Sequence, residues 1–241
     1  MPSLESLKVK LFMDGADVRA MAEAAARNPL IKGFTTNPTL MRNAGITDYA
    51  GFAREAIAAV NGLPISFEVF SDDFETMEKE ARVIHGWGGN TYVKIPVTNT
   101  QGKSAAPLIA KLSAEGIPLN VTAILTFSQI REVYEALDPK TPAIVSVFAG
   151  RIADTAVDPV PLMTEAVKLL AGKPKAELLW ASPRELLNIF QANDTGCQII
   201  TATNDVLKKL ALVGKDLTGY SLETVKMFYN DAKAAGYDLL G

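Results

Sequence analysis

The chain has 241 residues, of which 48% are hydrophobic and 21% are charged, and its formal net charge is −3. This composition is typical of a globular protein with a large core, and the acidic balance argues against a nucleic-acid-binding domain, which usually carries a basic face. The only cysteine, Cys197, excludes an intrachain disulfide and fits a reducing compartment. The sequence has neither an apolar signal core in Met1–Lys10 nor a membrane-spanning apolar stretch, so we expect a cytoplasmic protein without a membrane partner.

Short apolar runs recur along the chain at nearly even intervals. They predict eight strands, at Val9–Met13, Gly33–Thr36, Ile65–Phe70, Tyr92–Val97, Leu119–Ile124, Ala143–Phe148, Leu178–Ala181 and Gln198–Ala202. The stretches between these runs have helical periodicity and predict helices at Ala16–Ala26, Tyr49–Val60, Phe74–Ile84, Ser104–Ala114, Ser128–Ala136, Pro159–Leu170, Arg184–Ala192 and Asn204–Leu210. One more amphipathic helix is predicted over Leu222–Leu240, with an apolar face formed by Leu222, Val225, Phe228 and Tyr229.

The repeated alternation of strand and helix predicts an α/β fold, a single (β/α)8 TIM barrel over residues 1–241 with residues 222–240 as an extra C-terminal helix. An open doubly wound sheet is the alternative, but it usually has fewer strands and a glycine-rich phosphate loop after the first strand. The first turn, Met13–Asp17, does not match that loop. The last helix is expected to pack either on its own barrel or on a neighbouring subunit.

A lysine lies inside the fourth predicted strand, where Thr91–Val97 otherwise reads as a run buried on both faces. Lysine is rarely buried without a partner or a chemical role, and a desolvated amine can attack a carbonyl to form a Schiff base. The alternative is a structural lysine whose head reaches solvent or an acidic group. Glu68, between Phe67 and Val69, also needs a partner or a water if it is buried. We therefore treat Lys94 and Glu68 together as candidate catalytic residues.

In a TIM barrel the active site lies at the C-terminal ends of the strands. The polar residues at or near those ends are Asp14, Thr35, Thr36, Asn37, Glu68, Lys94, Asn120, Thr122, Ser146, Arg151, Ser182, Arg184, Thr201 and Thr203. Because a guanidinium group matches phosphate oxygens with paired hydrogen bonds, Arg151 and Arg184 are candidates for a phosphate site, with Ser182 as a further donor. The alternative is that each arginine is an exposed loop residue.

The single histidine, His85, precedes Gly86 in a segment typical of a helix C-terminus, where a histidine interacts well with the helix dipole. One histidine excludes metal sites built from several histidines. A carboxylate or the lysine itself is therefore favoured as the general acid or base.

Four segments together resemble the signature segments of the transaldolase family: Phe34–Thr39, Val93–Thr98, Leu119–Thr122 and Phe148–Ile152. The resemblance runs in order from Leu11 to about Leu207 and is to the short, single-barrel branch that also contains the fructose-6-phosphate aldolases. It implies transfer of a dihydroxyacetone unit from a ketose phosphate to an aldose phosphate in the pentose phosphate pathway, through a Schiff base and without a metal or other cofactor. The implied partners are sugar phosphates and other copies of the chain in a homo-oligomer.

The resemblance also implies roles for individual residues. Lys94 would form the Schiff base, Asp14 would assist proton transfer at the C3/C4 hydroxyl region, and Glu68 with Thr122 would position a water that moves protons during imine formation. The remaining residues would bind the substrate, with Thr35, Asn37, Asn120, Ser146 and Phe148 around the donor and Arg151, Ser182 and Arg184 at the phosphate. An iminium on Lys94 would store the carbanion left by C3–C4 cleavage as an enamine.

Two positions bear on the branch of the family. Phe148 and Glu68 stand where the aldolases of this group have a tyrosine and a glutamine, which favours transfer to an acceptor over release of free dihydroxyacetone. Two departures from the family pattern, Gly15 in the first turn and Pro183 in the phosphate loop, keep a modified sugar substrate open, because proline removes a backbone donor. A silent barrel that binds sugar phosphates and a phosphate-binding isomerase are the remaining alternatives.

Overall fold

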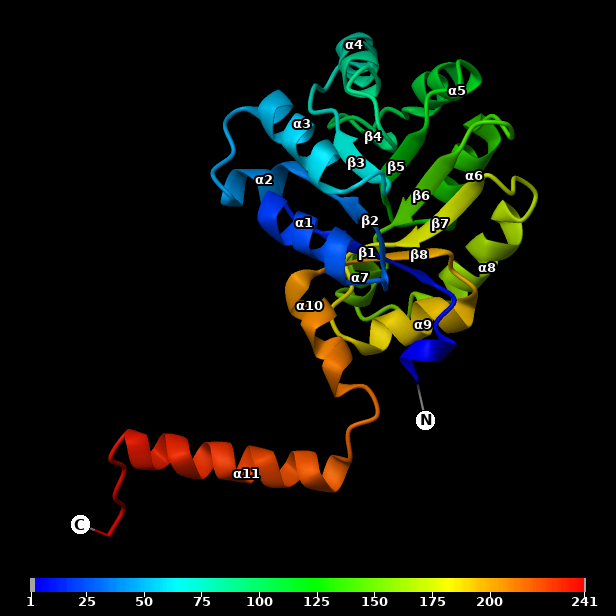
Figure 1. The fold of residues 1–241 in the computed structure, drawn as a ribbon. Helices are drawn as coiled ribbons and strands as arrows, with labels where there is room; N and C mark the ends of the chain where they lie inside the picture. Colours follow the sequence, from blue (N-terminus) through cyan, green and yellow to red (C-terminus); the bar gives the residue numbers. More distant parts are fainter. Residues whose placement is uncertain (1–2, 241) are drawn as a thin grey trace.

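Parallel strands form a closed barrel in the computed structural model, which describes residues 3–240 (Figure 1). The strands are β1 Lys10–Asp14, β2 Ile31–Thr35, β3 Ile65–Glu68, β4 Thr91–Pro96, β5 Leu119–Ile124, β6 Ala143–Val147, β7 Ala176–Trp180 and β8 Ile199–Thr203. They pair in chain order, and β8 pairs with β1 to close the ring. The predicted (β/α)8 barrel is therefore confirmed.

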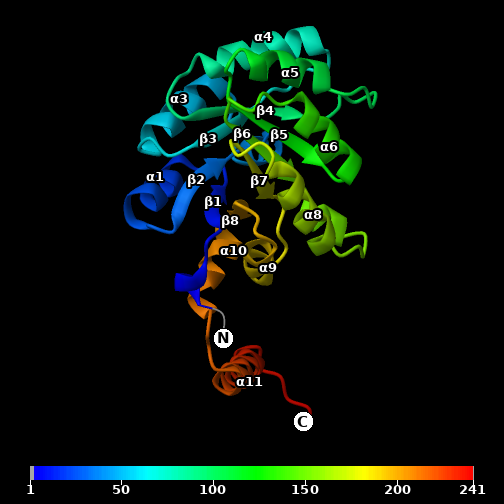
Figure 2. The same cartoon turned by 90° about the vertical axis from the view of Figure 1, so that its right-hand side faces the viewer.

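Helices surround the barrel, as the two views in Figure 1 and Figure 2 show. They are η1 Leu4–Ser6, α1 Val18–Arg27, α2 Pro38–Asn43, α3 Tyr49–Ala59, α4 Phe74–His85, α5 Ala106–Ala114, α6 Phe127–Ala136, α7 Ala149–Ala153, α8 Val160–Leu170, α9 Leu187–Thr195, α10 Asn204–Lys208, η2 Lys209–Leu212 and α11 Leu217–Ala234. The short helices α2 and α7 were not predicted, because neither is long enough to display a helical repeat. Asn37 as N-cap followed by Pro38 was a readable signal for α2.

The barrel interior has an apolar lower layer and a polar upper layer. Alternate residues of each strand point inward, and Phe12, Ile144, Leu179 and Ile199 form one buried apolar cluster with Ala181, which follows β7 at the barrel mouth. Gly33 makes room for the ring of Phe12, since a Cβ atom at Gly33 would lie 2.5 Å from Phe12 Cζ. The upper positions carry the polar residues described below, so the site lies on an apolar floor.

The C-terminal helix projects away from the barrel in both views (Figure 1 and Figure 2). It begins at Leu217, where Asp216 accepts a hydrogen bond from the N–H of Gly219, and it ends at Ala234, so the helix predicted over 222–240 is observed earlier in the chain. No residue of α11 is buried. The predicted apolar face is 53–62% exposed (Leu222, Val225, Phe228 and Tyr229), so this helix does not pack on its own barrel. No helix among residues 3–240 is long and apolar enough to cross a membrane.

Gly150 allows β6 and β7 to end close together. A Cβ atom at this position would lie 1.5 Å from the carbonyl oxygen of Ser182, a contact with backbone that no side-chain movement can relieve. Ser182 itself has a φ of 57°, in the left-handed region that costs energy for a residue other than glycine. Close packing of these two residues therefore fixes the backbone at one side of the barrel mouth.

We expect Gly150→Ala to lower the free energy of unfolding by about 3 kcal/mol, the upper end of overpacking costs, because the new methyl group collides with backbone. Gly15→Ala is the matched control, since its Cβ would meet only Met13 Cε at 4.0 Å, and it should change stability by less than about 0.5 kcal/mol. Urea denaturation of the two variants and the wild type measures both differences. Equal stability of the two variants would contradict the close approach at Gly150.

Candidate active site

A cavity of about 490 Å³ opens at the C-terminal ends of the strands. Its lining includes the predicted residues Asp14, Thr35, Asn37, Glu68, Lys94, Asn120, Thr122, Ser146, Phe148, Arg151 and Ser182. These residues come from β1 to β7 and the segments that follow them, so barrel closure brings them together. Arg184 does not line this cavity.

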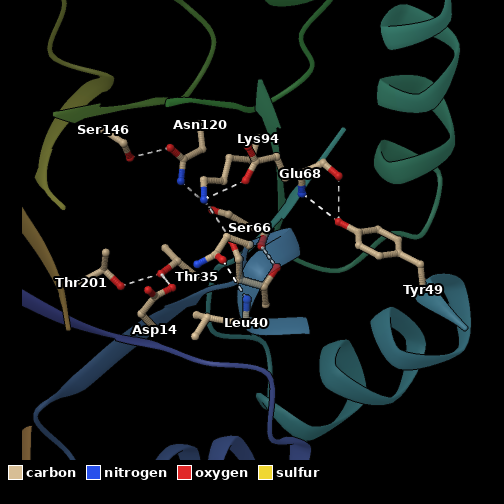
Figure 3. Close-up of polar contacts among 12 residues, drawn as sticks. Asp14, Thr35, Leu40, Tyr49, Ser66, Glu68, Lys94, Asn120, Ser146 and Thr201 are labelled. Atoms are coloured by element: carbon tan, nitrogen blue, oxygen red, sulfur yellow. Dashed lines mark hydrogen bonds and ion pairs between the residues drawn. The ribbon is translucent and has the colours of Figure 1, made fainter. Parts of the chain in front are cut away.

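Lys94 is the buried cation of the site, with an exposed fraction of 6%. Its Nζ lies 3.1 Å from Glu68 Oε2 and donates a hydrogen bond of 3.0 Å to the carbonyl oxygen of Thr36 (Figure 3). Lys94 and Glu68 are register partners on β4 and β3, so strand pairing alone makes them neighbours. A buried amine beside a carboxylate can exchange a proton locally and attack a carbonyl carbon.

A second polar group fixes the amide of Asn120. Its Nδ2 donates to Ser66 Oγ at 2.9 Å, and its Oδ1 accepts from Ser146 Oγ at 2.6 Å (Figure 3). All three side chains are buried. The two bonds assign the amide orientation and hold Asn120 beside Lys94, its register partner on β4.

Asp14 is held by a chain of two hydroxyl groups. Thr35 Oγ1 donates to Asp14 Oδ1 at 2.7 Å and lies 2.6 Å from Thr201 Oγ1 (Figure 3). Because Thr35 has one hydroxyl proton and gives it to Asp14, Thr201 must be the donor to Thr35. Burial raises the pKa of Asp14 above its ordinary value, and the charge of Lys94 opposes that shift. A carboxylate tuned in this direction is suited to act as a general base.

Thr122 lies where β5 leaves regular geometry. The register between β5 and β6 shifts after Val121, and the next residue after Thr122, Ala123, has a φ of 62°. The hydroxyl of Thr122 is buried and makes no hydrogen bond with other residues in the range 3–240. A buried hydroxyl of this kind usually binds an ordered water, so Thr122 stays a candidate for the predicted water-positioning role.

The candidate phosphate residues separate into two groups. Arg151 lines the cavity, with its guanidinium 5.6 Å from the ring centroid of Phe148, and Ser182 lines the same cavity. Arg184 instead forms an ion pair with Asp154, in which Nε donates to Oδ1 at 2.9 Å. The structure therefore places Arg151 and Ser182 in the same cavity as the other site residues. Arg184 lies outside that cavity and is paired with Asp154.

Some residues of the site were not predicted as such, or have an additional structural role. Asn37 caps α2, because its Oδ1 accepts from the N–H of Leu40 at 3.0 Å, and its two amide N–H donors and the second lone pair of Oδ1 remain for a ligand. Thr201 was noticed as a strand-end residue, but its bond to Thr35 could not be inferred. Ser66 was missed, although its alternation with Glu68 on β3 places it on the same face of the strand.

The other reactive side chains lie outside this site. His85 is the last residue of α4 and is followed by the C-cap Gly86, as predicted. Cys197 is buried, and burial raises the pKa of its thiol to about 12. Among residues 3–240, no group of three or more His, Cys, Asp or Glu side chains is arranged to hold a metal ion.

Known proteins support the same family. A family model described as Transaldolase/Fructose-6-phosphate aldolase matches residues 11–239. A protein named Probable transaldolase from Methanococcus maripaludis is 34% identical over 203 residues, which is 84% of this chain and 89% of that protein. Another of that name, from Sphingopyxis alaskensis, is 33% identical over 223 residues, 90% of this chain and 98% of that protein.

Similarity to solved structures extends to the barrel fold alone. Orotidine 5'-monophosphate decarboxylase from Sulfolobus solfataricus has a TM-score of 0.51 at 12% identity, over 93% of this chain and 99% of that chain. The family assignment therefore rests on the sequence matches, in agreement with the lysine–carboxylate pair and the hydroxyl-rich mouth. The chain belongs to the transaldolase/fructose-6-phosphate aldolase family.

Proposed function

We propose that this protein is a transaldolase that transfers a dihydroxyacetone unit from a ketose phosphate to an aldose phosphate through a Schiff base on Lys94. The observation that carries the proposal is the buried Lys94 amine, 3.1 Å from the Glu68 carboxylate in a cavity lined by hydroxyl and amide groups. The family to which the chain belongs supports this class of reaction.

The first half of the proposed reaction makes an imine. The Lys94 amine attacks C2 of the ketose, and the C2 oxygen leaves as water after it has been protonated. Glu68 and a water held near the free hydroxyl of Thr122 would supply and remove the protons of this step. The amide of Asn120, fixed by Ser66 and Ser146, would orient the donor hydroxyls.

The second half breaks and remakes a carbon–carbon bond. Asp14 takes the proton of the C4 hydroxyl, the C4 oxygen becomes the carbonyl of the leaving aldose, and the electron pair of the C3–C4 bond enters the iminium to give an enamine. The acceptor aldose then binds, its carbonyl carbon is attacked by the enamine, and the proton returns from Asp14. Water finally hydrolyses the imine and releases the new ketose.

The same barrel mouth supports release of free dihydroxyacetone as the second candidate reaction. An aldolase would hydrolyse the enamine-derived imine without waiting for an acceptor. Phe148, which lines the cavity, places no hydroxyl group there that could protonate the enamine carbon. This absence of a donor at position 148 favours transfer.

The C-terminal helix supports a homo-oligomer. Four apolar side chains on α11 are more than half exposed: Leu222, Val225, Phe228 and Tyr229. A contiguous apolar face of this kind is typical of a surface that is covered in the assembled protein. We propose that another copy of the chain covers it.

Borohydride trapping tests the imine. We expect incubation with fructose 6-phosphate and borohydride to add one three-carbon unit to the wild-type protein, because borohydride reduces the imine that remains after cleavage. Lys94→Ala should gain no mass, and intact-mass spectrometry measures both. A whole-sugar adduct would show imine formation without cleavage. The absence of an adduct with several ketose phosphates would contradict the proposal.

A separate assay of product release distinguishes the two candidate reactions. Equal release of product with and without an aldose acceptor would select the aldolase.

Asp14→Asn should reduce activity and increase stability. The activity should fall about 10²–10⁴-fold, the usual contribution of a general acid or base. Burial raises the pKa of Asp14 in the folded protein above its ordinary value of 3.8. At pH values between the ordinary and the raised pKa, the folded protein therefore binds more protons than the unfolded chain. The free energy of unfolding consequently falls as pH rises through that window. The variant should therefore be more stable than the wild type at neutral pH and lose this advantage below pH 3.8.

Urea denaturation at several pH values measures that difference. Asparagine keeps an acceptor for the Thr35 hydroxyl, so the comparison isolates the charge. A variant that is less stable than the wild type at neutral pH would show that the ionised carboxylate is stabilised by its surroundings.

Arg151→Ala and Arg184→Ala should differ in their effect on phosphorylated donors. Loss of a charged hydrogen bond costs about 1.5–3 kcal/mol, so Arg151→Ala should raise the donor KM about 10–100-fold. Arg184→Ala should have a smaller effect, since Arg184 lies outside the cavity and is paired with Asp154. Steady-state kinetics with fructose 6-phosphate measures both, and an equal or larger effect at Arg184 would mean that the ion pair opens when the donor binds.

A further inference from the structure

Tyr49, the first residue of α3, makes two hydrogen bonds to the backbone of Glu68 (Figure 3). Its hydroxyl donates to the carbonyl oxygen of Glu68 at 2.8 Å and accepts from the N–H of the same residue at 2.9 Å. A single hydroxyl therefore satisfies both backbone groups of one residue of the candidate catalytic pair.

The barrel leaves these two backbone groups without a strand partner. The last register pair of β2 and β3 is Thr35 with Ser66, and the carbonyl of Ser66 accepts from the N–H of Thr36. The chain then turns at Asn37 into α2, so β2 offers no residue opposite Glu68. On the other side, the N–H of Val69 bonds to the carbonyl of Lys94.

Neighbouring residues of a parallel strand direct their backbone groups to opposite sides, so those of Glu68 face the side that β2 has left. Buried backbone groups without partners are costly. The Tyr49 hydroxyl occupies the place of the absent strand residue and extends the hydrogen-bond ladder to the end of β3.

The tyrosine ring is held independently of its hydroxyl. It packs against three aromatic rings, those of Phe67, Phe70 and Trp87, at centroid distances of 6.4, 5.6 and 5.7 Å. Burial raises the pKa of Tyr49 above its ordinary value, so the hydroxyl stays protonated and remains a donor at neutral pH. Tyr49→Phe would thus keep the ring contacts and remove only the two hydrogen bonds.

We propose that Tyr49 is a positioning residue for the Lys94–Glu68 pair. This role rests on the proposed function of that pair. Its hydroxyl anchors the last residue of β3 and so holds the Glu68 carboxylate 3.1 Å from the Lys94 amine. No other side chain among residues 3–240 bonds the backbone N–H and carbonyl of Glu68. Without the anchor, the backbone of Glu68 loses its bonds on the side that β2 has left, so the end of β3 can shift and the carboxylate moves with it.

A double-mutant cycle tests this coupling. Tyr49→Phe should lower kcat for donor cleavage by about tenfold, part of the contribution of a general acid–base group, with less than about a twofold change in donor KM. In the Glu68→Gln background, Tyr49→Phe should have almost no further effect, because the carboxylate that it positions is absent. If the two substitutions instead lower kcat independently, so that the double variant loses the product of the two single-variant factors, the proposal is overturned.

Two control variants separate positioning from general stability. Tyr134→Phe removes a hydroxyl from a half-buried tyrosine on α6 and should leave kcat unchanged. Trp87→Phe weakens the packing around Tyr49 and leaves the Tyr49 hydroxyl in place. It should therefore lower the melting temperature but lower kcat less than Tyr49→Phe does. A loss of kcat in Trp87→Phe as large as in Tyr49→Phe would assign the effect to packing and overturn the proposal.

A readout without sugar distinguishes this proposal from the proposed function. Formaldehyde and cyanoborohydride methylate lysines through a small imine, and peptide mass spectrometry gives the rate at Lys94. Tyr49→Phe should move this rate in the same direction as Glu68→Gln, with other lysines unchanged, even if no ketose is cleaved. The proposal would be overturned if Glu68→Gln changes the methylation rate at Lys94 and Tyr49→Phe does not. It would also be overturned if Glu68→Gln methylates Lys94 at the wild-type rate.

Discussion

The site depends on one charge pair at the barrel mouth, the buried Lys94 with the partly buried Glu68. Desolvation of two charges costs several kcal/mol, and their attraction repays this only when the geometry is good and the remaining hydrogen bonds are made. The carbonyl of Thr36 accepts a hydrogen bond from the amine, and Tyr49 bonds to the backbone of the residue that carries the carboxylate. The pair is thus a costly feature that surrounding groups hold in place, and it lies at the centre of the proposed reaction.

The two layers of the interior make this arrangement possible. Below the pair, Phe12 fills the space that Gly33 leaves open, together with Ile144, Leu179 and Ile199. This apolar layer separates the site from the N-terminal end of the barrel. Electrostatic interactions above it act in a medium of low dielectric constant, where hydrogen bonds to charged groups are stronger than in water. The polar residues therefore orient one another, and the cavity is organised before a ligand enters.

The sequence predicted the fold because its signals are local. Strands buried on both faces are continuous apolar runs, and a charge inside such a run, as at Lys94, is conspicuous. The contacts that position the charge were not predictable in this way. The bond from Tyr49 to the backbone of Glu68 arises where β2 turns away from β3, and the pairing of Arg184 with Asp154 depends on how two loops meet. An amphipathic pattern likewise gave α11 its apolar face, but not its direction away from the barrel.

The hydrogen bond between Thr35 and Thr201 has a consequence for folding. It joins residues 166 positions apart and exists only when β8 has closed the ring on β1. Contacts of such long sequence separation form slowly, because loop-closure entropy is lost before they contribute. Asp14 consequently acquires its full set of partners at the end of folding, and a chain still lacking its last strand cannot hold the proposed general base in place. The proposed carbon–carbon bond cleavage should therefore appear only with the completed barrel, later than most of the secondary structure.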